Sequence, residues 1–408
     1  MTKRIELLAP AGDMEKLKTA IYFGADAVYF AGKNYGLRAL SSNFDNDEIK
    51  EAADFVHRHG KKCYVTINVY ARNDDFVGLD KYLKVLIDAK IDAVIVSDFG
   101  LINYIREHAP TLPIHVSTQA NTTNKYSVKA YTDMGIERVV LARELSIKEI
   151  QEIHDHNPNT ELECFVHGAM CISYSGRCLL SNYMTGRDSN HGACAQACRW
   201  HYSIIEDSRP DDKFEMQEDD RGAYILNSKD LCLVDYIDKI ASAGVTSFKV
   251  EGRMKSPYYV ATVINAYRRA IDYYYECEKY GKKYKAPDFI HQELVKPSHR
   301  KYTTGFMFND GQIRQNYESS IQTQESKFVG IVVDFIKGAA VIEQRNKFSV
   351  GDKLEILSPT DSFNKTITVK KILNKKGQEV DSAKLVQERV TVFFDEDIML
   401  SAGDILRM

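Results

Sequence analysis

The 408-residue sequence has no long run of apolar residues and no strong excess of either charge. It opens with MTKRIELLAPAGD, which is too polar for a secretory signal, and no later stretch of about 18 apolar residues could span a membrane. The net charge of −3 excludes a uniformly basic nucleic-acid coat. With 44% hydrophobic and 27% charged residues, the composition excludes a disordered chain, a collagen and a coiled coil. We therefore expect a cytoplasmic globular protein with no membrane partner.

Three motifs with well-understood chemistry are also missing. No GxGxxG follows the first predicted strand, which weighs against a dinucleotide-binding fold. No HExxH occurs, although zinc peptidases usually carry it. No two cysteines are spaced as C-x2-C, the knuckle that zinc ribbons usually contain in pairs. These absences narrow the chemistry but leave metal binding by dispersed cysteines open.

The chain does contain eight cysteines. Structural disulfides are rare in a reducing cytoplasm, so clustered cysteines there indicate metal binding or redox chemistry. Cys171, Cys178, Cys194, Cys198 and Cys232 form such a cluster. The remaining three, Cys63, Cys164 and Cys277, are expected to be packing residues.

Eight short apolar runs in the first 250 positions predict buried β-strands, and most of the gaps between them have helical periodicity. The expected strands cover residues 5–10, 26–32, 63–69, 92–98, 113–119, 138–144, 162–167 and 247–253. Strands of this kind alternating with amphipathic helices indicate a parallel α/β sheet, and eight of them favour a closed (β/α)8 TIM-like barrel. The alternative is an open, doubly wound sheet.

The pattern also predicts how the chain is divided. We expect the barrel over residues 1–280, with a cysteine-rich insertion at 167–245 between its last two strands. Loops at this end of a barrel strand build the active site, so the insertion is expected at the catalytic rim. Residues 281–327 read as a basic linker, and the short alternating strands of 328–408 predict a small all-β barrel.

Thiolates are ligands for zinc and for iron–sulfur clusters, and four of them complete either a tetrahedral zinc site or a [4Fe–4S] cluster. Successive cysteines at 171, 178, 194 and 232 are separated by six, fifteen and thirty-seven residues. Such spacings indicate a cluster gathered from separate loops, and we favour iron–sulfur over zinc. Buried inert thiols are the alternative.

Residues 163–181 fit the signature E-x-F-x2-G-[SA]-[LIVM]-C-x4-G-x-C-x-[LIVM]-S at every position. This stretch resembles peptidase family U32. Further blocks, among them LLAPAGD, VSTQANTTN, NSKDLC and FKVEGRMKSPYYVA, are similar to the family as well, and so is the β-rich tail. The resemblance therefore covers nearly the whole chain and implies the fold expected above.

The resemblance implies several possible activities. Some members of the family are known as collagenase-like peptidases, and others hydroxylate ubiquinone, ribosomal RNA cytidine or the wobble uridine of tRNA. A barrel with one short C-terminal β domain resembles the tRNA-hydroxylating subgroup. That likeness implies a [4Fe–4S] cluster held by Cys171, Cys178, Cys194 and Cys232, with Cys198 as an alternate ligand. It also implies prephenate as co-substrate and the tRNA anticodon stem-loop as partner. A peptidase, or a non-catalytic subunit paired with a second U32-family protein, is the alternative.

Polar residues just past the predicted strands are candidates for the site. An anionic metabolite such as prephenate needs cationic donors, and arginine offers bidentate geometry for carboxylates. The candidate substrate-binding residues are Arg38, Asn68, Gln119, Asn121, Arg143 and Arg253. The candidate catalytic residues are His167, Lys249 and Glu251. Each of them could instead order the rim of the barrel, and His167 could be a hydrogen-bonded rim histidine.

A basic segment between barrel and tail is the candidate RNA-binding region. Residues 279–302 contain seven Lys or Arg and two acidic residues, with tyrosines at 280, 284 and 302. Basic side chains neutralise phosphates, and aromatic rings stack on unpaired bases. The candidate contacts are Lys282, Lys283, Lys285, Arg300 and Lys301. A solvated linker is the alternative reading.

Overall fold

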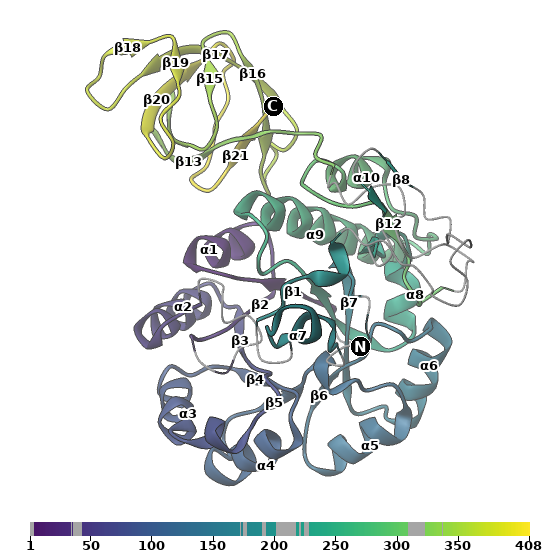
Figure 1. The fold of residues 1–408 in the computed structure, drawn as a ribbon. Coiled ribbons are helices and arrows are strands. Elements are labelled where there is room, and N and C mark those ends of the chain that lie inside the picture. Colours follow the sequence, from purple (N-terminus) through teal and green to yellow (C-terminus); the bar gives the residue numbers. More distant parts are fainter. Residues whose placement is uncertain are drawn as a thin grey trace.

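The computed structural model describes residues 4–33, 35, 43–171, 173, 178–189, 193–200, 218–219, 222–223, 228–308, 323–336 and 338–408. Eight parallel strands form a closed barrel, because β11 pairs with both β1 and β7 (Figure 1). They are β1 (Glu6–Pro10), β2 (Ala27–Phe30), β3 (Lys62–Ile67), β4 (Ala93–Val96), β5 (Ile114–Val116), β6 (Arg138–Val140), β7 (Glu161–Ala169) and β11 (Val245–Val250). The predicted TIM-like barrel is confirmed, with a strand inside each of the eight predicted regions or overlapping it.

Helices surround this barrel. They are α1 (Met14–Tyr22), α2 (Asn46–Arg58), α3 (Leu79–Asp88), α4 (Phe99–His108), α5 (Lys125–Asp133), α6 (Ile147–His156), α8 (Ile237–Ser242) and α9 (Pro257–Lys279). Local sequence explains where several begin. Asp45 and Glu48 form a capping box at α2, and Ser146 and Glu149 form one at α6, so orphan backbone N–H groups there are satisfied.

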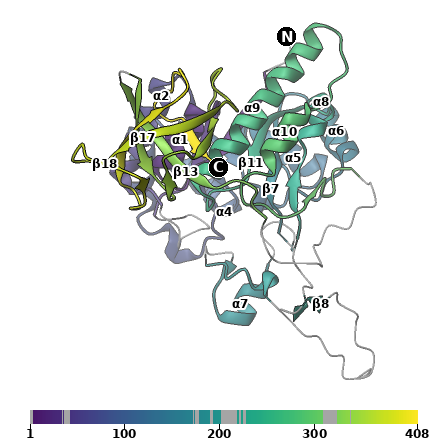
Figure 2. The same ribbon diagram turned by 90° about the horizontal axis from the view of Figure 1, so that it is seen from above.

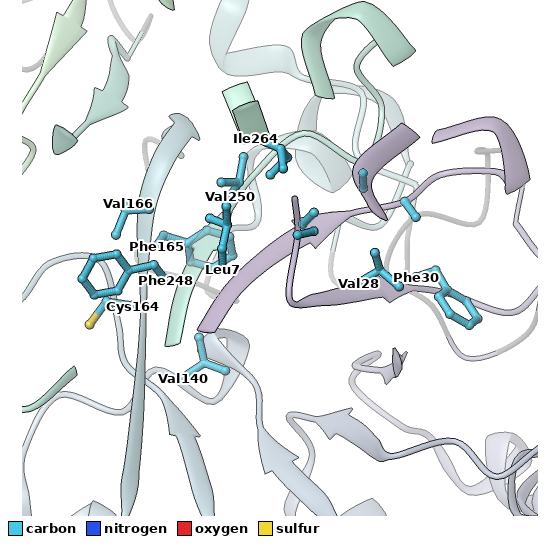
Figure 3. Close-up of a cluster of buried hydrophobic side chains, with 14 of the residues drawn as sticks. Leu7, Val28, Phe30, Val140, Cys164, Phe165, Val166, Phe248, Val250 and Ile264 are labelled. Carbon is cyan, nitrogen blue, oxygen red and sulfur yellow. The ribbon is translucent and has the colours of Figure 1, made fainter. Parts of the chain in front are cut away.

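The main core lies between the strands and the helices. Leu7, Phe248 and Val250 project from β1 and β11 toward Ile264 of α9, and all four are buried (Figure 3). The opposite faces of the strands fill the barrel interior, where a small apolar group includes Leu8, Tyr29 and Tyr64. Much of the remaining interior is charged, as described below.

The chain between β7 and β11 extends the sheet beyond the barrel. Strand β10 (Asp230–Cys232) pairs antiparallel with β7, and β12 (Tyr302–Thr303) pairs with β10. This region also contains α7 (Leu180–Thr185), the 3-10 turn η4 (Ala197–Arg199) and the short pair β8 (Glu218–Asp219) and β9 (Gly222–Ala223). Helix α7 overlies the barrel end in Figure 1 and stands clear of the barrel in Figure 2, so it lies over the C-terminal mouth.

The segment that we expected to be a linker has regular structure. Helix α10 (Asp288–Leu294) packs on α9, and β12 joins the extended sheet. Ile290 and Leu294 of α10 are buried in the same hydrophobic core as the barrel helices, so this segment packs against the barrel.

The C-terminal residues form a second, antiparallel barrel. It is built from β13 (Phe328–Ile336), β14 (Ala339–Gln344), β16 (Lys353–Leu357), β17 (Thr366–Leu373), β20 (Arg389–Phe394) and β21 (Ile405–Arg407), and β16–β17 pairing closes it. Short strands β15 (Phe348–Ser349), β18 (Glu379–Val380) and β19 (Ser382–Ala383) complete it. Its own hydrophobic core confirms the predicted all-β domain.

Buried charged side chains connect the two barrels. Arg407 of β21 is fully buried and lies 2.8 Å from Glu293 of α10. Lys296 bridges Glu293 and Glu355, and Tyr22 of α1 donates a hydrogen bond to Asp404. Among the described helices, including the 23-residue α9, none is both long and apolar enough to cross a membrane.

Candidate active site

The C-terminal mouth of the barrel gathers most of the predicted rim residues. Asn68 follows β3, Gln119 and Asn121 follow β5, Arg143 follows β6, and Arg253 follows β11. Carboxyl ends of parallel strands meet at one end of a barrel, so these side chains share the end at which the cysteine-rich insertion leaves β7. Arg38 lies outside the described residues.

Arg143 connects this mouth to the first cysteine of the insertion. Its Nη1 donates to the carbonyl of Ala169 at 2.8 Å, and its Nη2 lies 3.5 Å from a carboxylate oxygen of Glu251. The guanidinium lies 3.9 Å from the centre of the Phe165 ring, a cation–π distance. Loss of contact between the sulfur and water raises the pKa of the Cys171 thiol, and the positive charge of Arg143 opposes this rise. Arg143 is thus held by three partners beside the cysteines.

Two side-chain oxygens on the rim have no hydrogen-bond donor among the described residues. Oε1 of Gln119 and Oδ1 of Asn121 are buried and accept no hydrogen bond within the described part of the chain. Asn121 has a left-handed backbone (φ 54°), which asparagine tolerates better than most residues. Arg253 is buried nearby and donates to the hydroxyl of Thr66 at 3.3 Å. The rim therefore offers both acceptors and a cation.

Lys249 does not stand free at the mouth. It is buried inside the barrel, with Nζ 2.7 Å from Oε1 of Glu163 and 4.5 Å from the centre of the Tyr29 ring. Glu163 also pairs with Arg138 at 3.2 Å and accepts a hydrogen bond from Ser247. Burial opposes ionisation of Glu163, but Lys249 and Arg138 outweigh it and hold the pKa of Glu163 below its ordinary value.

Sequence reasoning missed this buried network. Arg138 of β6 contacts the carboxylate of Glu6 on β1 and the carboxylates of Glu161 and Glu163 on β7. A charged residue inside an apolar strand was the available signal, because Glu163 lies within the run LECFVH. The partners could not be named from that run, since they meet only when the barrel closes.

His167 is not placed as a base in the barrel mouth. Its backbone carbonyl accepts from the N–H of Glu251, but its ring packs against Tyr259 and Tyr267 of α9 and against Tyr302. A register irregularity in the β7–β11 pairing at this level accompanies the outward orientation. The ring is buried, and both its nitrogens lack a hydrogen-bond partner among the described residues. Burial lowers the pKa of His167 to about 3, so the imidazole is neutral.

Three of the predicted ligands influence one another electrostatically, and the fourth contacts α9. The thiols of Cys178 and Cys194 lie within electrostatic reach of Cys171. Cys232 faces α9 instead, with its sulfur 4.0 Å from the hydroxyl of Tyr267.

The donor set suits a thiolate-ligated cluster. Three of the cysteine sulfurs each accept a hydrogen bond from the backbone N–H two residues later in the chain. Ser173 donates to Cys171, Gln196 donates to Cys194 at 3.4 Å, and Val234 donates to Cys232. Hydrogen bonds to sulfur stabilise thiolates and tune iron–sulfur clusters. Among the described residues, no three of these thiols have their sulfur atoms within 4.8 Å of one another.

The basic segment is only partly available to a nucleic acid. Lys282, Lys283, Lys285 and Lys301 are exposed. Arg300 is 5% exposed and pairs with buried Asp230 at 3.4 Å, so the prediction that it contacts RNA does not fit its surroundings.

The tyrosines of this segment differ in the same way. Tyr280 is 65% exposed. Tyr284 is buried, Tyr302 is partly buried, and their hydroxyls donate to the carbonyls of Val234 and Leu294. One ring of the three can therefore stack on a base.

These features define a TIM-like barrel protein that has a cysteine-rich insertion over the barrel mouth and a small C-terminal β-barrel. The chain belongs to peptidase family U32, because residues 12–317 match that family's sequence model and residues 324–407 match its C-terminal domain.

Curated relatives in this family bear different names. The chain is 40% identical over 401 residues to tRNA hydroxylation protein P1 of Bacillus subtilis (strain 168), covering 98% of this chain and 94% of the relative. It is 37% identical over 420 residues to tRNA hydroxylation protein P of Escherichia coli (strain K12), covering 93% and 91%. It is 31% identical over 375 residues to a collagenase of Porphyromonas gingivalis (strain ATCC BAA-308 / W83), covering 87% of each.

Proposed function

We propose that this protein hydroxylates tRNA, forming 5-hydroxyuridine at the wobble position, with prephenate as co-substrate and a [4Fe–4S] cluster. The observation that carries the proposal is the cluster of Cys171, Cys178 and Cys194 beside Arg143 at the barrel mouth. Near-complete alignment with relatives named for tRNA hydroxylation supports the same activity. The proposal has three parts: hydroxylation of RNA, the wobble uridine of tRNA as the target, and prephenate as the co-substrate.

The cluster would be held by Cys171, Cys178, Cys194 and Cys232, with Cys198 as the alternate to Cys194. Cys232 reaches the other three only if its side chain turns away from Tyr267. When bound, such a cluster supplies electron transfer or a Lewis-acidic iron. The N–H groups of Ser173, Gln196 and Val234 would then donate to ligated sulfurs, and Arg143 would offset their negative charge.

An anionic metabolite would bind on the rim beside the cluster. Arg143 and Arg253 supply cations there, and prephenate carries carboxylates that pair well with guanidinium groups. The side-chain oxygens of Gln119 and Asn121 would accept from a hydroxyl of the ligand, as expected for buried acceptors with no donor of their own among the described residues. Glu251 would keep Arg143 in place between ligand and cysteines.

The anticodon stem-loop would lie along the exposed lysines of the segment between the barrels. Lys282, Lys283, Lys285 and Lys301 would neutralise phosphates, and the exposed ring of Tyr280 would stack on an unpaired base.

The decisive experiment is nucleoside mass spectrometry of tRNA from a strain lacking the gene, complemented with variants. The intact gene and Cys164→Ala should restore 5-hydroxyuridine derivatives, because Cys164 is a packing residue on β7. Cys171→Ser should fail to restore them and should lose the visible absorbance of an anaerobically purified cluster protein. Unchanged modification in the deletion strain, with no second enzyme of this kind present, would refute the proposal.

A peptidase is the second candidate, supported by the likeness to a collagenase. It would require a nucleophile and a base within hydrogen-bond reach. His167 does not provide that base, since its ring nitrogens have no hydrogen-bond partner in the described chain. Collagen cleavage that survives loss of Cys171 would favour the peptidase. Loss of modification without any activity of the isolated chain would favour a subunit that works with a second U32-family protein.

A further inference from the structure

The end of the barrel opposite the cysteine-rich insertion carries a second group of metal-ligand side chains. His57 lies in the last turn of α2, Cys63 is the second residue of β3, and Asp92 immediately precedes β4. All three positions are at the N-terminal ends of the strands or beside them. Cys63, which the sequence suggested was only a packing residue, therefore has two polar neighbours.

The three ligand atoms form a compact triangle. Nε2 of His57 lies 2.9 Å from Oδ2 of Asp92, and Sγ of Cys63 lies 3.6 Å from that oxygen and 3.9 Å from that nitrogen. Among the described residues, this is the one group of three or more His, Cys, Asp or Glu side chains whose ligand atoms all lie within 4.8 Å of one another.

This triangle matches one face of a tetrahedral zinc site. Zinc bonds of about 2.0–2.1 Å to nitrogen, about 2.0–2.2 Å to oxygen and about 2.3 Å to sulfur place neighbouring ligand atoms about 3.4–3.6 Å apart. The two distances from the sulfur are within a few tenths of an ångström of that value. The shorter His57–Asp92 distance is an ordinary hydrogen bond, which an entering ion would replace and widen by about half an ångström.

The surroundings suit a bound cation with an open fourth position. The Cys63 side chain is buried, while those of His57 and Asp92 are about one third exposed (31% and 28%). An open hollow of about 820 Å³, lined by charged side chains of α2 and by Lys90, borders His57 on its solvent side. The backbone N–H of Cys63 donates to Asp92 at 2.8 Å and orients that carboxylate.

We propose that His57, Cys63 and Asp92 bind one zinc ion, with water as the fourth ligand. An imidazole, a thiolate and a carboxylate together favour zinc over the hard cations calcium and magnesium, which prefer oxygen ligands. The ion would tie the end of α2 to the starts of β3 and β4. On binding, Cys63 loses its thiol proton to water, and no electron transfer is involved.

The test measures zinc and cobalt binding by the full-length chain and four matched variants. His57→Gln, Cys63→Ser and Asp92→Asn each remove one ligand, and Cys277→Ser removes a buried cysteine elsewhere, in α9. The insertion cysteines are identical in all five proteins, so their contribution to zinc content cancels in the comparison. After dialysis against zinc, we expect one equivalent fewer in each ligand variant than in the intact chain and in Cys277→Ser.

Cobalt provides the second readout. A thiolate-to-cobalt charge-transfer band that is present in the intact chain and in Cys277→Ser should be reduced in Cys63→Ser. Circular dichroism shows whether a variant is folded, and His57→Gln, whose side chain is partly exposed, serves if Cys63→Ser unfolds. Equal zinc content in all five folded proteins would overturn the proposal.

Discussion

The buried charge cluster inside the barrel predicts that Lys249→Met destabilises the barrel and that a second substitution, Glu163→Gln, restores part of the lost stability. Glu163 is fully buried, and its two oxygens are held by Lys249 at 2.7 Å and by Arg138 at 3.2 Å. Arg138 also pairs with Glu6 and Glu161. Three carboxylates and two cations give the cluster a formal charge of −1, and removing the ammonium makes it −2.

The expected loss of stability follows from that arithmetic. Removing one partner of a buried ion pair typically costs about 3–5 kcal/mol, because the remaining charge stays desolvated. Lys249→Met should therefore lower the free energy of opening of this part of the barrel by about that amount. Adding Glu163→Gln restores the charge to −1, so the double variant should recover much of the loss, with a coupling of up to about 3 kcal/mol.

Hydrogen exchange at individual amides is the appropriate assay, since a protein with two barrels need not unfold in one step. The amides of β7 and β11 should exchange faster in Lys249→Met and recover in the double variant. Those of β13 and β14 in the second barrel are the internal control and should not change. A loss below about 1 kcal/mol in the single variant, or no recovery in the double variant, would refute the reasoning.

The same pair predicts an acid dependence. Because the folded-state pKa of Glu163 is depressed, its stabilisation is complete above the ordinary glutamate pKa of about 4.3 and is lost as the pH falls through the folded value. Exchange at β7 should therefore become less pH-dependent below about pH 4 in Glu163→Gln. A stable double variant that no longer supports the proposed tRNA modification would assign the Lys249–Glu163 pair a chemical role in addition to this structural one.

The remaining predictions concern the basic segment and the domain contact. Replacing Lys282, Lys283 and Lys285 by Gln should weaken tRNA binding and reduce the slope of log affinity against log salt by about 1 for each of these lysines that binds a phosphate, with unchanged stability as the control. Arg300→Ala should instead destabilise the sheet around β10 by about 3–5 kcal/mol, as hydrogen exchange of the β10 amides would show, because it removes the cation that pairs with a buried aspartate. Arg407→Met should loosen the second barrel and speed proteolysis between the barrels, and equal cleavage rates would contradict that role.

The sequence was sufficient to predict the barrel because its signals are local. The run PIHVSTQ and its seven counterparts are apolar, short and bounded by helical periods, so each strand could be found by itself. The rim residues were also predictable, since a position just past a strand implies the C-terminal mouth. Asn68, Gln119, Asn121, Arg143 and Arg253 all lie there.

The predictions that differed from the structure depended on distant partners. Arg300 appears in a basic run, but the carboxylate of Asp230, 70 positions earlier, buries and neutralises it. The orientation of His167 depends on the strand register at its level and on tyrosines of α9 and β12. Cys232 likewise matches the ligand pattern, yet its sulfur faces Tyr267. Periodicity locates a strand but does not specify which face an irregular residue occupies.

Arg143 lies between the barrel interior and the insertion. Its position provides positive charge at the barrel mouth, where an anion could bind. Phe165 lies between two cations, with Arg143 at 3.9 Å and Lys249 at 5.5 Å from its ring centre. Lys249 forms an ion pair with Glu163 inside the barrel. Arg143 contacts Glu251 and the backbone carbonyl of Ala169, and its charge acts on the Cys171 thiol. A cation held by one carboxylate and one carbonyl keeps part of its charge for a further anion, which is what thiolates or an anionic metabolite require. The Lys249–Glu163 pair is therefore a structural element of the barrel interior beneath the site, and Arg143 supplies the positive charge beside the cysteines.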